Sequence, residues 1–328
     1  AFKNTYSLFH RIVGWLTVRK LEATNKWIGV FENADLIIVG GGQLFLDAGL
    51  NFPLKLFVLT KIAKKSNSKV CCVACGVSSS WTWLGLLLFR EFFFYKNMRN
   101  ISVRDKQSKN NLIKHFKYLN TSITQVFDPA LLAKDAYKIE RKNNGNTVGL
   151  NLMHPNTLLK HIPECTNFEF KNLENLWFNL INDLSSKGYE VVLFTNGARK
   201  DNEFLDHIYT IVNKNKIQAL MKPKDPEGLV NIIANFDVTV AHRLHANIIA
   251  FSLGVPSVGL IWDNKVEEFG YQTKRNDFFI DPSEQNNTKI AQLVTNAFTH
   301  KIDGSELKSM QDNFISTLET QINTSIKM

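Results

Sequence analysis

The segment VTVAHRLHAN, residues 238–247, joins a short apolar run to a cluster of basic side chains. Residues 238–241 predict a buried strand, and a helix is expected over 244–253. Arg243 and His245 stand where the strand gives way to the helix. Open α/β folds bind ligands at the carboxyl ends of parallel strands, and the N–H groups and dipole at a helix start attract anions. The segment therefore predicts an anion-binding site at the edge of a parallel sheet.

The segments around it follow the same order of strand, loop and helix. Lys265 follows the next predicted strand, so adjacent strands of one sheet would bring Lys265 near His245. Asn151 and His154 lie just past another predicted strand and are weaker candidates for the same edge. A lone cationic side chain is usually a solvated surface group, but several at consecutive strand ends favour a ligand. The strands are expected over 147–152, 190–195 and 257–261, and the helices over 173–187, from Asp201, and over 226–234.

The first half of the chain has the same pattern. Apolar runs over 35–39 and 69–75 each end in glycine and predict buried parallel strands. Gly40, Gly41 and Gly42 follow the first run, and such a loop lets a backbone or a ligand approach closely. By pattern alone, a ligand loop and a structural turn are equally expected. A further strand is expected over 101–103, and helices over 52–63, over 84–95 and from Asp105.

The polar stretch KIERKNNGN, residues 138–146, interrupts this pattern with charges and turn residues, as an interdomain linker would. We therefore expect an α/β fold of two Rossmann-like doubly wound domains, 1–143 and 144–328, with the last helices packing back on the first domain. The chain starts at Ala1, and the residues after it already look helical. This start favours an N-terminus truncated relative to the natural protein, with a first strand and its glycine loop missing.

The chain has 39 Lys and Arg against 30 Asp and Glu, a net charge of +9. This excess favours an anionic partner, which can be a phosphorylated substrate, an anionic membrane face or a nucleic acid. We do not expect nucleic acid, because the basic residues are spread along the chain and no reading motif is present. With 44% apolar and 21% charged residues, the composition is that of a globular protein.

Four cysteines do not make the disulfide framework of a secreted protein, so a reducing cytoplasm is the expected compartment. Cys72 and Cys75 formally match a CxxC metal or redox pair. They lie inside a predicted buried strand, however, where thiols behave as small apolar groups, and no second pair completes a zinc site. We expect no metal ion and no cofactor.

The stretch WTWLGLLLFREFFFY, residues 81–95, is strongly apolar and aromatic. It is shorter than the about 20 residues that span a bilayer. A buried or partly buried helix is the favoured interpretation. The alternative is an interfacial helix that docks the protein on a membrane, with basic residues nearby to meet anionic headgroups. These basic residues are Lys96, Arg99, Lys106 and Lys109.

Six short motifs occur in a fixed order: VGGGQLF at 39–45, SVRDKQS at 102–108, DPA at 128–130, RLH at 243–245, GVP at 254–256 and WDNK at 262–265. In these motifs, and over most of the chain from Asp35 to Phe269, the sequence resembles the polysaccharide pyruvyl transferase family. The block from Arg243 to Lys265 is the specific part of the match, whereas a glycine run such as residues 40–42 is common in unrelated proteins. The chain departs from the family before Ala34, where the usual first strand and glycine-asparagine loop are not recognisable.

The resemblance implies a glycosyltransferase-B-like pair of domains facing a central cleft, and an enzyme that moves pyruvate from phosphoenolpyruvate to a sugar. It implies that phosphoenolpyruvate binds among Arg104 of the first domain and Arg243, His245 and Lys265 of the second. The acceptor, a sugar of a cell-surface polysaccharide or a lipid-linked oligosaccharide, would lie beside the glycine loop. Asp47 can bind a sugar hydroxyl or act as base there, although a helix-capping or solvated Asp is favoured. The implied place of action is the cytoplasm, including the inner face of the cell membrane.

These residue types suit that chemistry. Phosphoenolpyruvate carries a carboxylate and a phosphate on neighbouring atoms, and an Arg fork can hold either group in two-point contact. His245 is the preferred general acid or base, because imidazole gives and takes protons near neutral pH. The alternative for His245 is a hydrogen-bonded structural role at a helix start. Lys265 and Arg243 would neutralise the charge on departing phosphate.

Two other functions stay open at this stage. A glycosyltransferase of the same architecture would use a nucleotide sugar, because fold does not determine function. A non-catalytic anion-binding or membrane-associated scaffold is also compatible with the net charge. The acceptor sugar, the ketal position and the oligomeric state are left open by the sequence.

Overall fold

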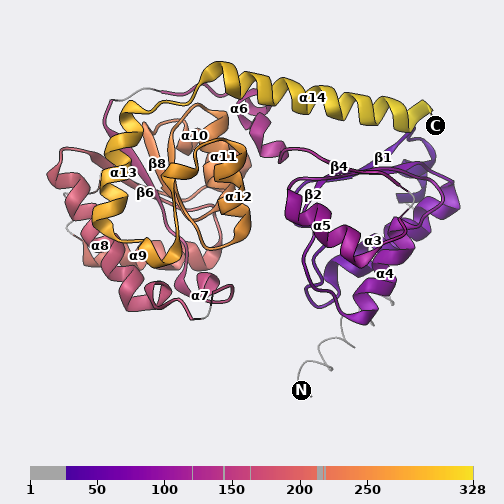
Figure 1. Ribbon diagram of the computed structural model, residues 1–328, viewed down its shortest axis with the longest axis horizontal. Coiled ribbons are helices and arrows are strands. Elements are labelled where there is room, and N and C mark those ends of the chain that lie inside the picture. Colours follow the sequence, from indigo (N-terminus) through magenta and orange to yellow (C-terminus); the bar gives the residue numbers. More distant parts are fainter. Residues whose placement is uncertain are drawn as a thin grey trace. The chain divides into compact units, whose positions relative to one another are not determined.

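A computed structural model describes residues 27–119, 121–142, 145–162, 164–212, 217 and 219–327 (Figure 1). The expectation about the N-terminus concerns residues that lie outside this set. The chain divides into two compact units. Unit 1 comprises Ala1–Asp128 and Asp312–Met328, and unit 2 comprises Pro129–Gln311.

Unit 1 is built on a parallel sheet of four strands in the order β1-β2-β3-β4. Figure 1 shows α3, α4 and α5 on one side of this sheet and the C-terminal part of α14 on the other. The strands are β1 (Ile37–Gly40), β2 (Val70–Cys75), β3 (Met98–Val103) and β4 (Ile123–Gln125). The helices are α3 (Asn51–Ser66), α4 (Trp83–Phe93), α5 (Lys106–His115) and α14 (Gly304–Lys327).

The core of unit 1 forms because β2 is apolar at every position and α4 is aromatic on its inner side. All six residues of β2 are buried, as expected of a strand covered on both faces. Phe45 packs against Phe89 and Phe93 with ring centroids 5.6 and 4.6 Å apart. Burial raises the pKa of the Cys71 thiol to about 11. Cys72 and Cys75 are likewise buried, so the CxxC pair forms part of the strand.

Unit 2 contains a parallel sheet of six strands in the order β10-β9-β8-β5-β6-β7. A dense core lies on the side of α8 and α13, and a second one on the side of α10 and α11, so the sheet is covered on both faces. The strands are β5 (Thr147–Asn151), β6 (Glu190–Phe194), β7 (Ala219–Met221), β8 (Val238–Ala241), β9 (Ser257–Leu260) and β10 (Phe279–Ile280). The covering helices are α8 (Phe170–Ser186), α10 (Pro226–Ile233), α11 (Leu244–Ser252) and α13 (Asn287–Thr299).

The alternation of residues along the strands explains the two faces. Val148 and Leu150 of β5 point into the α8 and α13 core, whereas Gly149 between them leaves room for Phe236 in the other core. A Cβ atom on Gly149 would lie 2.3 Å from the Phe236 ring. Further elements of unit 2 are η1 (Pro129–Leu132), α6 (Ala133–Tyr137), α7 (Pro155–Leu158), η2 (Thr166–Phe168), α9 (Arg199–Ile211), α12 (Asn264–Gln272), η4 (Asn276–Phe278) and η5 (Pro282–Glu284).

The predicted α/β class with parallel sheets in two domains is confirmed. The predicted boundary at 143/144 differs from the observed division, which falls after Asp128. Residues 129–142 join unit 2 because Ala133 packs into the α10 and α11 core and Arg141 binds the backbone there. Arg141 Nη1 donates to the carbonyl oxygen of Gly254 at 2.8 Å. This charged residue, which suggested a linker, therefore binds the body of unit 2.

Candidate functional site

The topological switch point of unit 2 lies between β5 and β8, because the strand order runs outward from this pair in both directions. In open α/β sheets, ligands bind outside the carboxyl ends of the strands at such a point. Asn151 and His154 lie at the end of β5, and Arg243 and His245 follow β8. Lys265 follows β9, the neighbour of β8. The structure thus places the predicted residues of unit 2 at one edge of one sheet.

Arg243 is held by a buried carboxylate. It stands directly before α11, and its Nε and Nη2 atoms donate to Asp201 Oδ2 at 2.9 and 2.6 Å. Asp201 is fully buried in the first turn of α9, whereas 24% of the Arg243 side chain is exposed. The pair does not involve Nη1. A guanidinium fixed along one edge in this way can present its other edge to an anionic ligand.

The turn from β8 into α11 is closed by a buried amide. Asn247 has no exposed surface, and its Nδ2 atom donates to the carbonyl oxygens of Ala241 and Arg243 at 3.1 and 3.2 Å. The backbone on both sides of the basic cluster is therefore tied to the helix. This bracing keeps Arg243 and His245 at defined positions before any ligand arrives.

His245 is exposed and lines a cavity of about 660 Å³. That volume is in the range of small-molecule sites, which are concave and mostly apolar with a few polar groups. Tyr137, Asn196, Lys224 and Asp225 supply the other polar side chains, and Pro129 and Ala130 of the DPA motif also line the cavity. The remaining lining residues are Ala133, Ala136, Gly197, Pro223, Pro226, Leu229, Val230 and Ile249.

Lys265 lies in the first turn of α12 and shares a carboxylate with a histidine. Asp263, the N-terminal cap of α12, accepts from the backbone N–H of Lys265 at 2.9 Å. Its Oδ2 atom lies 3.7 Å from Lys265 Nζ and 3.9 Å from His161 Nδ1. The His161 ring packs edge-on against Trp262. Lys265 and Arg243 therefore follow neighbouring strands but engage different carboxylates.

Asn151 and His154 are tied to the next loops of the same edge. Asn151 is fully buried and donates from Nδ2 to Asn196 Oδ1 at 2.9 Å, while its own Oδ1 has no partner within the described part of the chain. The backbone N–H of His154 donates to Asp201 Oδ1 at 3.0 Å. Burial lowers the pKa of His154, which favours the neutral form of this imidazole. Asp201 thus connects the β5 loop to Arg243.

His242, directly before Arg243, is a buried neutral imidazole. Its Nε2 atom donates to Gln285 Oε1 at 3.1 Å, because the amide of Gln285 uses its own nitrogen to donate to two backbone carbonyls. Burial lowers the pKa of His242 to about 3. Its carbonyl oxygen accepts from Trp262 Nε1 at 2.6 Å. His242 therefore fastens the end of β8 to the end of β9.

Arg104 lies at the carboxyl ends of the strands of unit 1. It follows β3, is only 6% exposed, and donates from Nη1 to Asp128 Oδ2 at 2.8 Å and from Nη2 to Gln43 Oε1 at 3.1 Å. Gln43 comes directly after the glycine loop. A Cβ atom on Gly76 would lie 2.3 Å from Gln43 Oε1 and 3.2 Å from Arg104 Nε, so a larger residue there would displace the Gln43 side chain from Arg104. Arg104 thus joins the ends of β1, β3 and β4.

The glycine loop after β1 needs glycine for its backbone. Gly41 and Gly42 have φ angles of 77° and 66°, in the left-handed region that other residues rarely adopt. A Cβ atom on Gly40 would lie 3.0 Å from the carbonyl oxygen of Val73 on β2. The backbone N–H of Gly41 donates to that same oxygen at 3.0 Å. The loop is therefore pinned to β2, which accounts for its glycines without a ligand.

Asp47 is engaged in the structure of unit 1. Its Oδ2 atom accepts from the backbone N–H and the hydroxyl of Thr82 at 2.7 and 2.6 Å, and its Oδ1 atom accepts from the backbone N–H of Leu50 at 3.2 Å. Thr82 is the N-terminal cap of α4. Asp47 therefore orders the start of two helices. That Arg104, Asp47 or the glycine loop binds a ligand stays a prediction.

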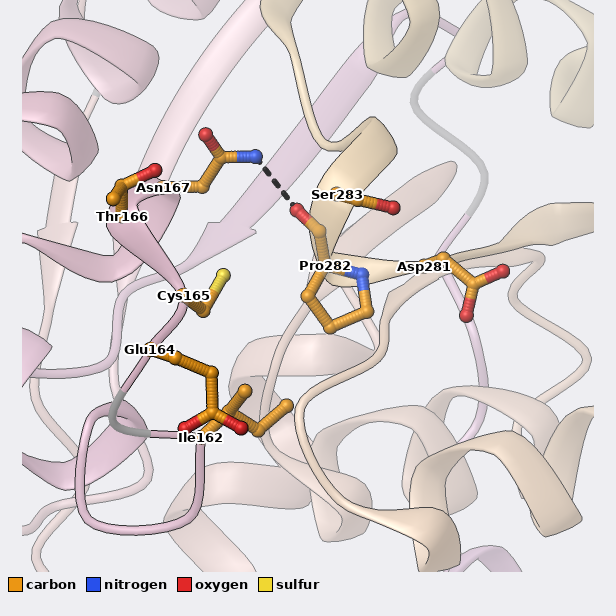
Figure 2. Close-up of a pocket in the computed structure, with 8 residues that line it drawn as sticks. All are labelled: Ile162, Glu164, Cys165, Thr166, Asn167, Asp281, Pro282 and Ser283. Atoms are coloured by element: carbon orange, nitrogen blue, oxygen red, sulfur yellow. Dashed lines mark hydrogen bonds between the residues drawn. The ribbon is translucent and has the colours of Figure 1, made fainter.

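Figure 2 shows a second pocket of unit 2, of about 440 Å³, away from these residues. The side chains of Cys165 and Glu164 lie on one side of it, and Asp281 and Ser283 on the other. Asn167 Nδ2 donates across it to the carbonyl oxygen of Pro282 at 2.7 Å. None of the residues predicted from the sequence lines this pocket, and its acidic groups do not suit an anionic ligand.

Sequence reasoning missed several polar groups of the unit 2 edge, among them Asp201, Asn196 and Lys224. Asn196 lies just past the end of β6, so the strand-end rule that selected Asn151 would have found it as well. Asp201 and Lys224 lie further along their loops or helices and carry no local signal. Of the predicted residues, the structure joins Arg243 and His154 through Asp201.

Among the residues that the structure describes, no three or more His, Cys, Asp or Glu side chains are grouped to hold a metal ion. No helix in the same residues is long and apolar enough to cross a membrane.

The two parallel α/β sheets in two units have the glycosyltransferase-B-like fold, and solved structures of that fold resemble the chain. A UDP-GlcNAc 2-epimerase from Methanocaldococcus jannaschii shares 14% identity at a TM-score of 0.56, covering 88% of this chain and 78% of its own. One from Neisseria meningitidis bound to UDP-GlcNAc shares 12% identity at a TM-score of 0.51, covering 89% and 80%.

The chain belongs to the polysaccharide pyruvyl transferase family, whose model matches residues 2–264. It is accordingly a transferase of polysaccharide biosynthesis. No curated protein matches the chain. The family that the six motifs resemble is thereby confirmed, and so is the glycosyltransferase-B-like α/β fold with parallel sheets in two domains.

Proposed function

We propose that this enzyme transfers pyruvate from phosphoenolpyruvate to a sugar of a cell-surface polysaccharide or of its lipid-linked precursor, forming a ketal and releasing phosphate. The observation that carries the proposal is the edge of the unit 2 sheet, where Arg243, His245 and Lys265 follow two neighbouring strands at the switch point. Family membership supports the pyruvyl group, and the basic side chains support an anionic donor.

The residues can be assigned roles that suit such a donor. Arg243, oriented by Asp201, would bind the carboxylate or the phosphate of phosphoenolpyruvate in two-point contact. His245, on the wall of the cavity, would serve as general acid and base. Lys265, at the start of α12, would neutralise the phosphate as it departs. Arg104 of unit 1 would bind the same donor, as the family resemblance implies.

The reaction balances without a further reagent. A proton adds to the methylene carbon and leaves a cationic centre at the neighbouring carbon. One sugar hydroxyl attacks that centre and loses its proton, the carbon–oxygen bond to phosphate breaks, and a second hydroxyl attacks the same carbon. Of the two hydroxyl protons, one ends on the new methyl group and the other on phosphate. A single His that first donates and then accepts a proton can serve these steps.

The test is incubation of the full chain with phosphoenolpyruvate and a panel of diol-bearing sugars and lipid-linked oligosaccharides. We expect phosphate release matched by one added pyruvate in the mass of the acceptor. His245→Asn and Lys265→Ala should lower the rate by about 10²–10⁴. Lys187→Ala, at an exposed position at the end of α8, is the matched control and should leave the rate unchanged.

The alternative is a glycosyltransferase that uses a nucleotide sugar. Thermal protection by uridine or guanosine diphosphate, with neither protection by phosphoenolpyruvate nor phosphate release, would support that alternative and contradict our proposal. Full activity in Arg243→Ala and His245→Ala variants would show that the reaction centre lies elsewhere.

A further inference from the structure

The outward face of α4 exposes large apolar side chains. Trp83 is 78% exposed, Leu87 is 52% exposed, and Phe94, the residue after the helix, is 44% exposed. With Arg90 these residues are spaced by four, three and four positions, so they lie along a single line on the helix. We call this line the α4 stripe.

The stripe is not the core-facing side of the helix. The opposite side of α4 carries Gly85, Phe89, Phe92 and Phe93, all of which are buried. The helix is therefore apolar on two sides, and only the side with Gly85 and Phe89 is buried in unit 1. Because a soluble surface rarely exposes grouped large apolar side chains, such a patch indicates an interaction surface.

The surroundings of the stripe are strongly basic. Residues 83–118 contain eight Lys and Arg but two Asp and Glu, and of the eight only Arg104 is buried. Phe94 meets Phe116 edge-on with ring centroids 5.6 Å apart, so the end of α5 lies beside the end of α4. This contact brings the exposed Lys114 and Lys117 to the same region of unit 1, and Lys96 next to Phe94 is also exposed.

The stripe itself combines aromatic rings with a cation. The guanidinium of Arg90 lies 5.7 Å from the centroid of the Phe94 ring. Trp, Phe and Arg are the side chains that settle at the boundary of lipid headgroups and acyl chains, where rings meet the acyl region and the cation meets phosphate. At 11 residues, α4 is far shorter than the about 20 residues that span a bilayer, so it can lie only in the plane of the surface.

We propose that the α4 stripe docks unit 1 on an anionic lipid bilayer, with Trp83, Leu87 and Phe94 inserted between headgroups. Arg90 and the flanking lysines contact the lipid phosphates. The charge of the region complements an anionic bilayer, which is why we choose lipid as the occupant. The proposal does not depend on the pyruvyl donor, because its test measures binding and not catalysis.

The test is sedimentation of the full chain with vesicles of phosphatidylglycerol and phosphatidylcholine, against vesicles of phosphatidylcholine alone. We expect binding to the anionic vesicles that weakens as salt is raised. The double variant Trp83→Ser with Leu87→Ser should bind at least about tenfold more weakly, because about two large apolar side chains are lost from the interface. Tyr271→Ser in α12, at a residue 62% exposed in unit 2, is the matched control and should bind as the unaltered chain does.

A second pair of variants tests the charge. Lys114→Glu with Lys117→Glu should weaken binding at least about tenfold, since each basic residue near the surface contributes about fivefold. Lys187→Glu in unit 2 is the control. All these positions are exposed, so unchanged circular dichroism is expected throughout.

Equal binding of the stripe variant and its Tyr271 control would overturn the proposal, and so would the absence of binding to anionic vesicles. A change in oligomeric mass of the stripe variant without any vesicle binding would assign the stripe to a second copy of the chain instead. Quenching of Trp fluorescence by brominated lipids, reduced in Trp83→Phe while binding persists, would support insertion at this helix.

Discussion

Breaking the Arg243–Asp201 pair should lower the free energy of unfolding of unit 2, and the size of the loss tests whether Asp201 holds Arg243 in place. Asp201 is fully buried, and Arg243 Nε and Nη2 both donate to one of its oxygens. In Arg243→Ala the carboxylate keeps the N–H of His154 but loses its cation. Removing one partner of a buried pair costs about 3–5 kcal/mol, and the partial exposure of Arg243 favours the lower figure, about 3 kcal/mol.

The magnitude of the coupling comes from a double-mutant cycle. Asp201→Asn removes the buried charge and should cost about 2 kcal/mol. The variant with both changes should lose about 3 kcal/mol instead of the sum, because no uncompensated carboxylate is left, so the coupling is about 2 kcal/mol.

The assay is urea unfolding of the full chain, with amide hydrogen exchange to show that the loss lies in unit 2. The slopes of the urea transitions must agree among the variants for the free energies to be comparable. A coupling below about 0.5 kcal/mol, the value of an exposed ion pair, would refute the view that Asp201 holds Arg243 in place.

Three further outcomes are expected. His242 is neutral when folded because burial lowers its pKa to about 3 from 6.5, so its contribution to stability is present above pH 6.5 and is lost as the pH falls toward 3. The free energy of unfolding, measured in urea, should therefore fall less steeply with pH over that range in His242→Gln. The difference in slope should be up to about 1.4 kcal/mol per pH unit. Asp47→Ala should lower stability by about 1–2 kcal/mol in urea unfolding, because it frees the N–H and hydroxyl of Thr82. Gly149→Ala should reduce the melting temperature by several degrees, since its Cβ meets the buried Phe236 ring at 2.3 Å. The control Gly188→Ala should reduce it less, because no atom lies near its Cβ and only the strain of its φ angle of 83° remains.

The fold could be predicted from the sequence because buried parallel strands are apolar along their whole length. The run over 69–75 corresponds to β2, in which every residue is buried. The domain boundary was predicted less accurately. A charged stretch such as residues 138–146 is typical of a linker, but also of a segment whose charges form ion pairs or hydrogen bonds with the surface of a domain. Arg141, in that stretch, lies 3.5 Å from the buried carboxylate of Asp237.

The candidate site could be predicted as far as it depends on strand ends. Arg243, His245 and Lys265 follow predicted strands, and any parallel sheet brings such positions to one edge. Asp201 was missed because its contact with Arg243 depends on the order of the strands. The two residues are 42 positions apart, and β5 lies between the strands that precede them. Strand order follows from packing of the whole sheet and leaves no local trace in sequence.

The assignment of Asp312–Met328 to unit 1 has a consequence for how the protein is made. Asn100 on β3 donates to Ser325 Oγ at 2.8 Å, and Phe314 is buried, so one layer of unit 1 comes from the distal end of the chain. A ribosome must therefore synthesise all of unit 2 before that layer emerges. Until then the contact between α14 and β3 is missing, so we expect unit 1 to complete its fold only after unit 2 has been synthesised.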